Sequence, residues 1–234
     1  MMTDPLISVV ICVYNGERFL GEAIDSVFGQ DYRPIELIVV DDGSDDRSAE
    51  IARSYADVRV LSQENRGVGA ARNAGIEASS GAFLAFLDAD DVMLPSKLSD
   101  QAGYLSTHPE VDYVLCRQKL VSDSGSDLPA WARRDPIFGD PGGVQPTSGV
   151  VRRSALERAG GFDPSVRMGD GMEWLSRLRE VGIKIDILPE VLLVRRVHED
   201  NLTHDQAAFT ESLFRTLKAR ADRAQVREGD DESV

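Results

Sequence analysis

Short apolar runs that alternate with helical patterns constrain this chain more than any other feature. Residues 6–13 form a nearly continuous apolar run rich in valine and isoleucine, the pattern of a strand buried on both faces of a parallel sheet. A helical pattern follows at residues 19–27, where apolar residues recur at three- and four-residue spacing, and a glycine and a proline mark its end. Residues 35–40 then repeat the strand pattern. Strand and helix therefore alternate from the start of the chain.

The same alternation continues through most of the chain. Further strands are predicted at residues 58–61, 82–87, 113–116, 183–187 and 191–197, and helices at residues 44–55, 69–78, 97–107, 154–159 and 169–181. This pattern predicts an α/β fold, with a Rossmann-like, mostly parallel sheet, right-handed crossovers and helices on both faces. Ligands of such sheets bind beyond the carboxyl ends of the strands. We therefore expect the functional residues at residues 12–15, 41–44 and 88–91.

Length and composition favour a single folded domain followed by a short tail. With 234 residues and 42% hydrophobic content, the chain can bury a substantial core. We place the domain at residues 1–200, and an amphipathic helix near 206–224 with an acidic tail within residues 201–234. The basic side of that helix fits a solvated face of a docked helix, with contact to an anionic membrane surface or a partner as the alternative. Residues 122–146, rich in Asp, Gly and Pro, suggest a mobile insertion over the site.

Charge and cysteine content exclude several classes of protein. The chain carries 40 acidic and 26 basic residues, a formal net charge of -14, which argues against a nucleic-acid partner because phosphate binding needs clustered lysines and arginines. Cys12 and Cys116 are too few for a disulfide framework, and no CxxC pair suggests zinc. The first apolar run lacks a basic start and is too short to span a bilayer. We therefore expect a cytoplasmic protein, free or peripheral to the inner face of the membrane.

Two groups of aspartates follow two strands that we predict to be neighbours. Asp41 and Asp42 end one strand, and Asp88, Asp90 and Asp91 follow the other. Like charges gathered at strand ends repel unless a cation or a proton lies between them. Mg²⁺ and Mn²⁺ bind carboxylate and phosphate oxygens, usually through only one or two protein carboxylates, so the Asp-x-Asp spacing predicts a divalent metal site. The alternative is N-capping of the following helix by Asp90 or Asp91.

The order of these motifs along the chain is more specific than any one of them. The motifs are VVICVYN at residues 9–15, VDDGS at 40–44, NRG at 65–67, ARNAG at 71–75 and FLDADD at 86–91. In this order and spacing the chain resembles the family 2 glycosyltransferases, an inverting family of GT-A fold that uses nucleotide diphosphate sugars. The resemblance runs from about residue 6 to residue 201 and includes GGFD at 160–163 and RRVH at 195–198. It implies that the single domain has the GT-A fold.

The resemblance implies a donor site at the ends of the first two strands. Tyr14 and Asp41 would bind the base, because an aromatic ring can stack on it and a carboxylate can accept from a uracil edge. Asn15 and Asp42, next to them in the two motifs, would belong to the same donor site. UDP is the expected nucleotide, with GDP and dTDP as alternatives.

The resemblance also implies a site for the diphosphate and the metal. Arg72 would face the diphosphate, although a surface ion pair is an equal alternative for this residue alone. Asp88 would reach the ribose or a metal-bound water, and Asp90 would bind Mn²⁺ or Mg²⁺ between the two phosphates, so that charge on the leaving diphosphate is neutralised. His198 would face the diphosphate or complete the metal shell, with a purely structural role as the alternative.

The sequence leaves three possibilities for the general base. The family usually has a Glu-Asp pair at the start of a late helix, and this pair aligns with Asp170 and Gly171 here. Either Asp170 is the base, or Glu173 one turn on is, or the function is lost. We favour Asp170, among glycines at a helix start, with N-capping as its alternative role. Trp174 would pack against an acceptor ring or belong to the core.

The sequence therefore predicts an inverting, metal-dependent hexosyltransferase-like enzyme. Its partners would be a nucleotide diphosphate sugar, most plausibly a UDP-sugar, and the hydroxyl of a glycan, a lipid-linked acceptor or a small molecule. A module that binds nucleotide sugars without catalysing transfer is the alternative, because Gly171 stands where a carboxylate is expected. A nucleotidyltransferase fits less well, because residues 14–17 are not a glycine-rich phosphate loop.

Overall fold

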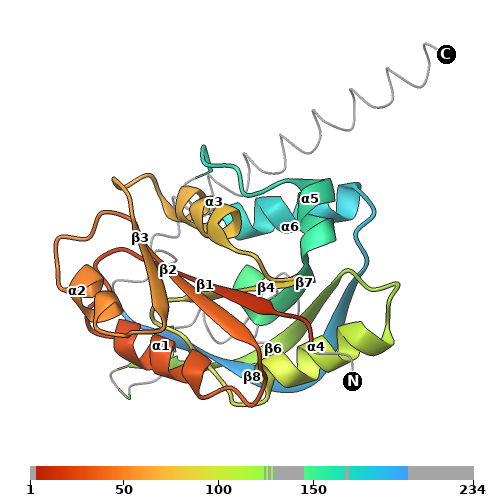
Figure 1. The fold of residues 1–234 in the computed structure, drawn as a ribbon, viewed down its shortest axis with the longest axis horizontal. Coiled ribbons are helices and arrows are strands. Elements are labelled where there is room, and N and C mark those ends of the chain that lie inside the picture. The colour runs from red at the N-terminus through yellow and green to blue at the C-terminus, as the bar shows by residue number, and fades with distance from the viewer. Residues whose placement is uncertain (1–3, 124, 126–127, 129–144, 167–168, 200–234) are drawn as a thin grey trace, which may run out of the picture.

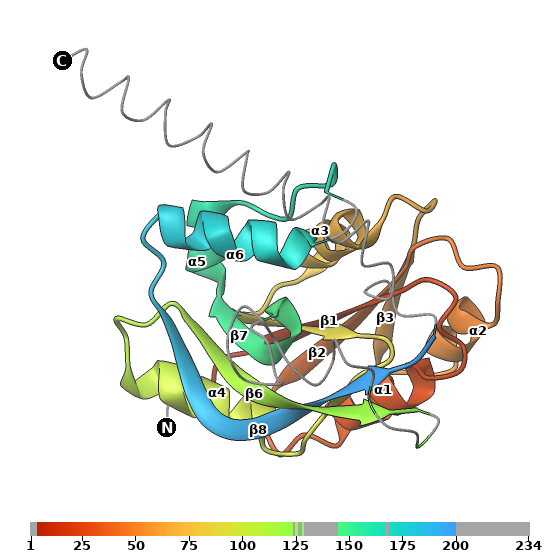
Figure 2. The ribbon, with the colours of Figure 1, turned by 180° about the vertical axis from the view of Figure 1, so that it is seen from behind.

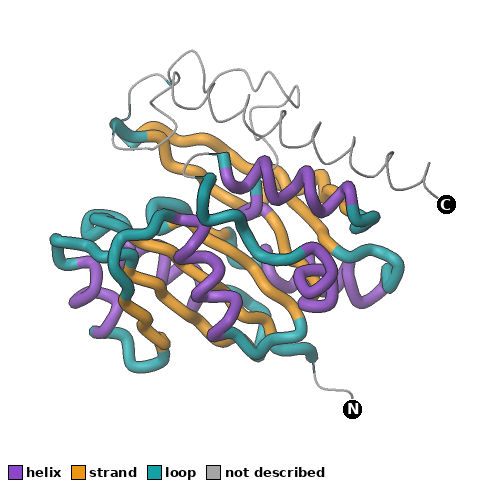
Figure 3. Tube along the Cα trace, turned by 90° about the horizontal axis from the view of Figure 1, so that it is seen from above, coloured by secondary structure: helices purple, strands orange, loops and turns teal. Residues whose placement is uncertain are grey.

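One eight-stranded sheet runs through the protein, in the strand order β3-β2-β1-β4-β7-β6-β8-β5. The computed structural model describes residues 4–123, 125, 128, 145–166 and 169–199. The strands are β1 (Ile7–Val13), β2 (Ile35–Asp41), β3 (Val58–Ser62), β4 (Phe83–Asp88), β5 (Val92–Met93), β6 (Tyr113–Ser122), β7 (Gly149–Arg152) and β8 (Ile185–Val197). The sheet is curled, as the view from above shows (Figure 3).

Parallel pairing brings the ends of β2 and β4 to the two sides of β1. β1 pairs in parallel with β2 and with β4, and β2 pairs in parallel with β3. In this register Val13 lies opposite Asp41, and Cys12 lies opposite Asp88. The two groups of aspartates therefore meet at one edge of the sheet, because parallel strands end on the same side.

The other half of the sheet is mixed. β7 pairs antiparallel with β4 and with β6, β6 pairs in parallel with β8, and β5 pairs antiparallel with β8. β8 is long and lies beside β6 along most of its length (Figure 2). Its carboxyl end reaches β5, directly after the acidic run that follows β4. This pairing brings the late part of the chain to the predicted site.

Helices cover both faces of the sheet. They are α1 (Leu20–Phe28), α2 (Ser48–Arg53), α3 (Val68–Ala78), α4 (Lys97–Thr107), α5 (Arg153–Ala159) and α6 (Asp170–Glu180), with a 3₁₀ turn, η1 (Pro146–Ser148). α1, α2 and α4 lie on one face, and α3, α5 and α6 lie on the other (Figure 1). In the described part of the chain, no helix has the length and apolar character needed to cross a membrane.

Alternating side chains of the strands point to opposite faces of the sheet and pack into two separate hydrophobic cores. Val9 and Ile11 of β1 pack with α1 and α4, while Val10, between them, packs with α3. α3 lies so close to β1 that a Cβ at Gly75 would come 2.2 Å from Val10 Cγ1. Only a glycine allows this approach, which places the polar side chains of α3 near the end of β1.

The predicted α/β fold is confirmed, with local corrections. The two strands expected at 183–187 and 191–197 are one strand, β8, whose pairing with β6 shifts register near Arg117. β5 and β7 were not expected, since strands of two and four residues give almost no periodic signal. The helix expected at 44–55 is shortened to α2, because the residues before Ser48 form a loop. The helix predicted at 206–224, the acidic tail and most of the segment 122–146 lie outside the described residues.

Candidate functional site

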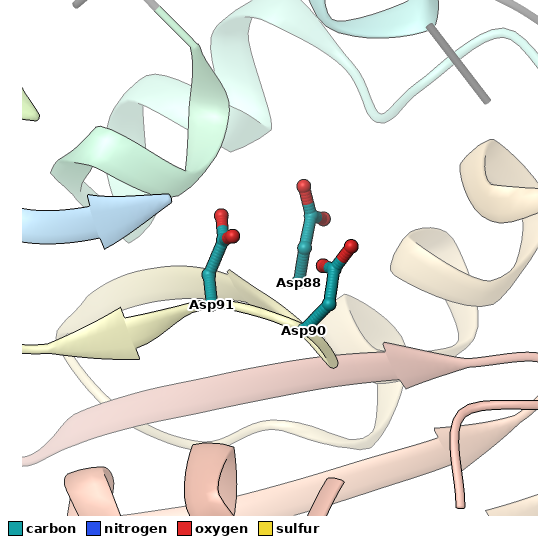
Figure 4. Close-up of side chains that lie close together, drawn as sticks. All are labelled: Asp88, Asp90 and Asp91. Atoms are coloured by element: carbon teal, nitrogen blue, oxygen red, sulfur yellow. The ribbon is translucent and has the colours of Figure 1, made fainter. Parts of the chain in front are cut away.

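Three carboxylates gather directly after β4. β4 ends at Asp88, and the chain then turns, with the Asp91 amide donating to the Asp88 carbonyl at 3.1 Å. One oxygen each from Asp88, Asp90 and Asp91 lies within 4.8 Å of the others. All three carboxylates point to the same side of the loop (Figure 4). This spacing fits shared coordination of one cation.

The surroundings of the cluster disfavour bare negative charge. Burial raises the pKa of Asp88, Asp90 adds to this effect, and the Arg72 guanidinium opposes it. Burial, together with Asp90 and Asp88, raises the pKa of Asp91 well above its usual range. Asp91 Oδ2 is buried and has no hydrogen-bond partner among the described residues. A divalent cation would be a partner for Asp91 Oδ2 and would supply positive charge to the carboxylates. The residues present therefore fit Mg²⁺ or Mn²⁺.

The carboxyl end of β8 closes one side of the cluster. The Arg196 amide donates to Asp91 Oδ1 at 3.0 Å, and Arg196 Nε donates to the Asp90 carbonyl at 3.2 Å. His198 Nε2 lies 2.9 Å from Asp90 Oδ2, and its ring lies against Phe19, with centroids 4.9 Å apart. The structure thus brings together Asp90 and His198, two residues that the sequence assigned to one site.

Arg72 lies on the opposite side, between two carboxylates. Its Nη2 donates to Asp88 Oδ1 at 2.9 Å and its Nη1 donates to Asp170 Oδ2 at 2.5 Å. The guanidinium is buried and lies over the Phe162 ring, 5.2 Å from its centroid. Burial alone would lower the pKa of Arg72, but Asp170 and Asp88 raise it. This is a buried bridge rather than the surface ion pair considered from sequence.

The two candidate bases, one helical turn apart, have different partners. Asp170 begins α6 and reaches Arg72, which links it to Asp88. The N-cap position belongs to Gly169, whose φ is 75°, and Asp170 makes no side-chain cap hydrogen bond. Glu173 is buried and accepts from Arg177 Nε with both oxygens, at 2.8 and 3.0 Å. The structure therefore connects Asp170 to the acidic cluster through Arg72.

Trp174 belongs to the core beneath α6. Its ring is fully buried, packs against Phe86, Phe162 and Tyr113, and its Nε1 donates to the Gly160 carbonyl at 3.1 Å. Of the two roles considered from the sequence, the structure supports the core role, because a fully buried ring offers no face to an acceptor.

Tyr14 and Asn15, which follow β1, are both exposed but differ in their contacts. Tyr14 is 52% exposed, so its ring is available for stacking. Asn15 has a positive φ of 51°, and its side chain accepts from the Asp45 amide at 2.9 Å while its own amide donates to Ser44 Oγ at 3.0 Å. Asn15 therefore ties the loop after β1 to the loop after β2, which fixes the place from which Tyr14 projects.

Asp41 and Asp42, the second donor-site pair, are both buried but have different hydrogen-bond partners. Asp41 is buried and its Oδ1 accepts from the Ser44 amide at 3.0 Å. Asp42 is also buried, and it accepts from the amides of Arg66 and Gly67, at 2.9 and 2.8 Å, and from Gln63 Nε2 at 2.6 Å. Asp42 thus shapes the loop that leads into α3, the helix that carries Arg72.

Sequence reasoning missed two residues of this site. Asp91 was weighed as a helix cap, although its position inside the acidic run was a signal for metal binding. Arg196 gave no signal, because its contacts depend on where β8 ends relative to β5. Its neighbour Arg195 also lowers the pKa of Asp88 and of Asp91 through its charge. Basic residues of β8 therefore balance part of the acidic charge.

The sequence matches a known protein family over this same region. The family described as Glycosyl transferase family 2 matches residues 8–158, which include the strands β1 to β4 and the acidic cluster. The chain belongs to this family. An uncharacterized glycosyltransferase of Bacillus subtilis, EpsJ, is 32% identical over 238 residues, covering 92% of this chain and 69% of the relative. An uncharacterized glycosyltransferase of Rickettsia prowazekii is 40% identical over 127 residues, covering 53% and 40%. This glycosyltransferase family member thus spans 40% to 69% of the length of these relatives.

Solved structures show that the fold is that of the GT-A glycosyltransferases. Residues 1–349 of TarS from S. aureus, in complex with UDP-GlcNAc, superpose with a TM-score of 0.74 at 22% identity, covering 90% of this chain and 65% of that TarS chain. The mannosyltransferase PcManGT from Pyrobaculum calidifontis, in complex with GDP-Man and Mn²⁺, gives a TM-score of 0.73 at 22% identity, covering 94% and 65%. At this identity the likeness establishes the fold, and the predicted GT-A architecture is confirmed.

Proposed function

We propose that this chain transfers a sugar from a nucleoside diphosphate sugar to an acceptor hydroxyl, with inversion at the anomeric carbon. The observation that carries the proposal is the arrangement around Arg72: one buried guanidinium joins Asp88, a member of the acidic cluster, to Asp170 at the start of α6. Donor-binding and base functions need groups of these types a few ångströms apart. Membership of the glycosyltransferase family supports the reaction class.

The donor would lie along the ends of β1, β2 and β4. Tyr14 would stack on the base, and Asp41 would accept a hydrogen bond from its edge, which favours uracil and hence a UDP-sugar. Asp42 and Asn15 would hold the two loops in place. Arg72 and Asp88 would face the diphosphate and the ribose.

The metal would lie at the acidic cluster. Asp90 and Asp88, with His198 beside them, would hold Mn²⁺ or Mg²⁺, and the buried oxygen of Asp91 supports a further carboxylate ligand. A divalent cation bound there supplies positive charge against the leaving diphosphate. The protein's own contribution would be to orient Asp91 through the amide of Arg196 and His198 through the ring of Phe19.

Asp170 would be the general base. The acceptor hydroxyl would give its proton to the Asp170 carboxylate while its oxygen attacks the anomeric carbon, and the bond from that carbon to the diphosphate oxygen would break with its electron pair on the diphosphate. Because attack and departure take place on opposite faces, the configuration inverts. The pairing of Glu173 with Arg177 argues against Glu173 in this role. The acceptor would be a glycan, a lipid-linked saccharide or a small molecule with a hydroxyl.

A donor screen tests the proposal directly. Purified protein with Mn²⁺ is incubated with UDP-, GDP- and dTDP-sugars and a panel of hydroxyl acceptors, and release of the nucleoside diphosphate is measured. We expect release from a UDP-sugar, its loss in Asp90→Asn and in Asp170→Asn, and no change in Asp57→Asn, an exposed aspartate at the far end of the sheet. Calorimetric binding of a donor without turnover on any acceptor would instead identify a nucleotide-sugar-binding module.

A further inference from the structure

Position 171, where the family pattern has a carboxylate, has no room for a side chain in this protein. A Cβ built on Gly171 would come 2.7 Å from Cδ and 2.8 Å from Cγ of Pro146. Pro146 is the first residue of the turn η1, and Gly171 lies in the first turn of α6, next to Asp170. The pyrrolidine ring therefore occupies the space that a side chain at position 171 would need.

Two buried side chains donate hydrogen bonds to backbone carbonyls of η1, the turn that begins with Pro146. Tyr113 of β6 donates its hydroxyl to the Pro146 carbonyl at 3.0 Å, and Gln101 of α4 donates Nε2 to the Ser148 carbonyl at 2.9 Å. Both side chains are fully buried. The Tyr113 ring is itself wedged in place, because a Cβ at Gly149 would come 2.2 Å from it. η1 is thus a fixed support and not a surface loop.

Tyr113, which holds η1 in place, also contacts α6. The Tyr113 ring packs against Trp174, one turn beyond Asp170, with centroids 5.7 Å apart. The first turn of α6 is therefore contacted by Pro146 on one side and, through Asp170, by Arg72 on another. Both contacts come from outside the helix, and together they set where the Asp170 carboxylate lies.

We infer that Pro146, supported by Tyr113, is a positioning residue for Asp170. The first turn of α6 packs against the pyrrolidine ring of Pro146, and this contact fixes the position of that turn. The inference rests on the proposed function of Asp170 as the base. The contact with Pro146 also explains why position 171 carries no carboxylate in this chain, because a side chain there would displace either Pro146 or the helix that carries Asp170.

The test is a double-mutant cycle on the contact between Gly171 and Pro146. Gly171→Ala forces a methyl group against Pro146, and we expect kcat to fall roughly ten- to a hundred-fold with the donor KM unchanged, because a base displaced by about 1 Å loses that much. Pro146→Ala removes the two ring carbons that the methyl group would meet. We therefore expect Pro146→Ala combined with Gly171→Ala to recover kcat to within about threefold of Pro146→Ala alone.

Two further variants separate positioning from general effects on folding. Gly103→Ala is the matched control, since Gly103 lies within α4 and a Cβ there meets no heavy atom of the described residues within 4 Å. It should leave kcat unchanged, although alanine favours both helices over glycine. Tyr113→Phe keeps the ring but removes the hydroxyl from the Pro146 carbonyl, and it should lower kcat while donor binding in calorimetry stays the same.

The outcomes distinguish this inference from the proposed function. If Asp170→Asn abolishes transfer but Gly171→Ala is fully active, or if the double variant is no better than Gly171→Ala, the positioning role of Pro146 is wrong while the base assignment stands. If Asp170→Asn keeps full activity, the base assignment itself fails, whatever the cycle shows.

Discussion

Arg72 and Asp170 lie 98 positions apart in the chain, yet the guanidinium donates to the carboxylate at 2.5 Å in the buried centre of the site. The same guanidinium binds Asp88 at 2.9 Å. A diphosphate that draws Arg72 toward itself would weaken its hold on Asp170. This arrangement would couple donor binding to the position of the Asp170 carboxylate.

Removing the guanidinium should destabilise the protein as well as inactivate it. Arg72→Gln leaves two carboxylates without their cation, and breaking a buried pair costs about 3 to 5 kcal/mol, with the lower end expected here because Asp88 is 32% exposed. Urea unfolding measures the loss. Adding Asp170→Asn to this variant should restore part of the stability but no activity. Arg179→Gln, at an exposed position of α6, should change the unfolding free energy by less than about 0.5 kcal/mol. An equal effect at both arginines would contradict the buried bridge.

Mn²⁺ should stabilise the native protein through the acidic cluster. A ligand that binds only the folded state at a hundred times its Kd adds about 2.7 kcal/mol to the unfolding free energy, which appears as a rise in the melting temperature. Asp90→Asn should remove this rise, and Asp57→Asn should keep it. Scanning fluorimetry with Mn²⁺ or EDTA measures both.

Asp91→Asn should separate stability from metal binding. Burial raises the pKa of Asp91 well above its usual range, so the ionised carboxylate is costly in the metal-free protein. Asparagine keeps an oxygen for the Arg196 amide without that charge. We expect a more stable metal-free protein with a smaller response to Mn²⁺. A metal response equal to that of the unmodified protein would remove Asp91 from the site.

Asp42 should be a residue of loop architecture more than of chemistry. Its carboxylate accepts from two amides and one side-chain amide of the segment 63–67, and asparagine cannot accept from all three donors. We expect Asp42→Asn to lower the unfolding free energy by about 2 kcal/mol. Hydrogen exchange should accelerate at the amides of Arg66 and Gly67. Asp45→Asn, an exposed neighbour, is the control, and equal exchange in the two variants would contradict this role.

The part of the site formed by the parallel strands could be predicted from the sequence, because the pattern of apolar residues locates these strands. Apolar runs located β1, β2 and β4, and parallel pairing alone brings Asp41 and Asp88 to the two sides of β1. The role of Arg72 came from the family resemblance, since the residue alone fitted a surface ion pair equally well and its burial between Asp88 and Asp170 is seen only in the structure.

The rest of the site depends on pairing that periodicity does not encode. β7 has four residues and runs antiparallel, and η1 precedes it, so nothing local indicated that Pro146 would meet Gly171. The contacts of Arg196 follow from how far β8 extends along β5. One signal was readable: Glu173 and Arg177 have the i, i+4 spacing of a helical ion pair, which already pointed to a structural role.

Lys97 should make the stability of the protein depend on pH in the alkaline range. Its side chain is fully buried and donates to Gln101 Oε1 at 2.9 Å, and burial lowers its pKa from 10.5 to about 8. Between these two values the unfolded chain binds more protons than the folded one, so this group's contribution to stability rises with pH. Below pH 8 the charged lysine costs about 3 kcal/mol, and above 10.5 the cost has vanished.

Lys97→Met removes the buried charge and isolates this contribution. At pH 7 the variant should be more stable than the unmodified protein, by less than about 3 kcal/mol because Gln101 Oε1 loses a donor. The advantage should shrink by about 3 kcal/mol as the pH rises from 7.5 to 10.5, and urea unfolding at several pH values measures it. Tyrosine titrations occur in both proteins and largely cancel in the difference. The Lys97 charge lowers the pKa of Cys116, so the titration of this thiol changes with the substitution and is followed separately by its thiolate absorbance. Lys184→Met, at an exposed position, should give a difference that is flat with pH. Parallel curves for Lys97→Met would show that folding does not lower the pKa of Lys97.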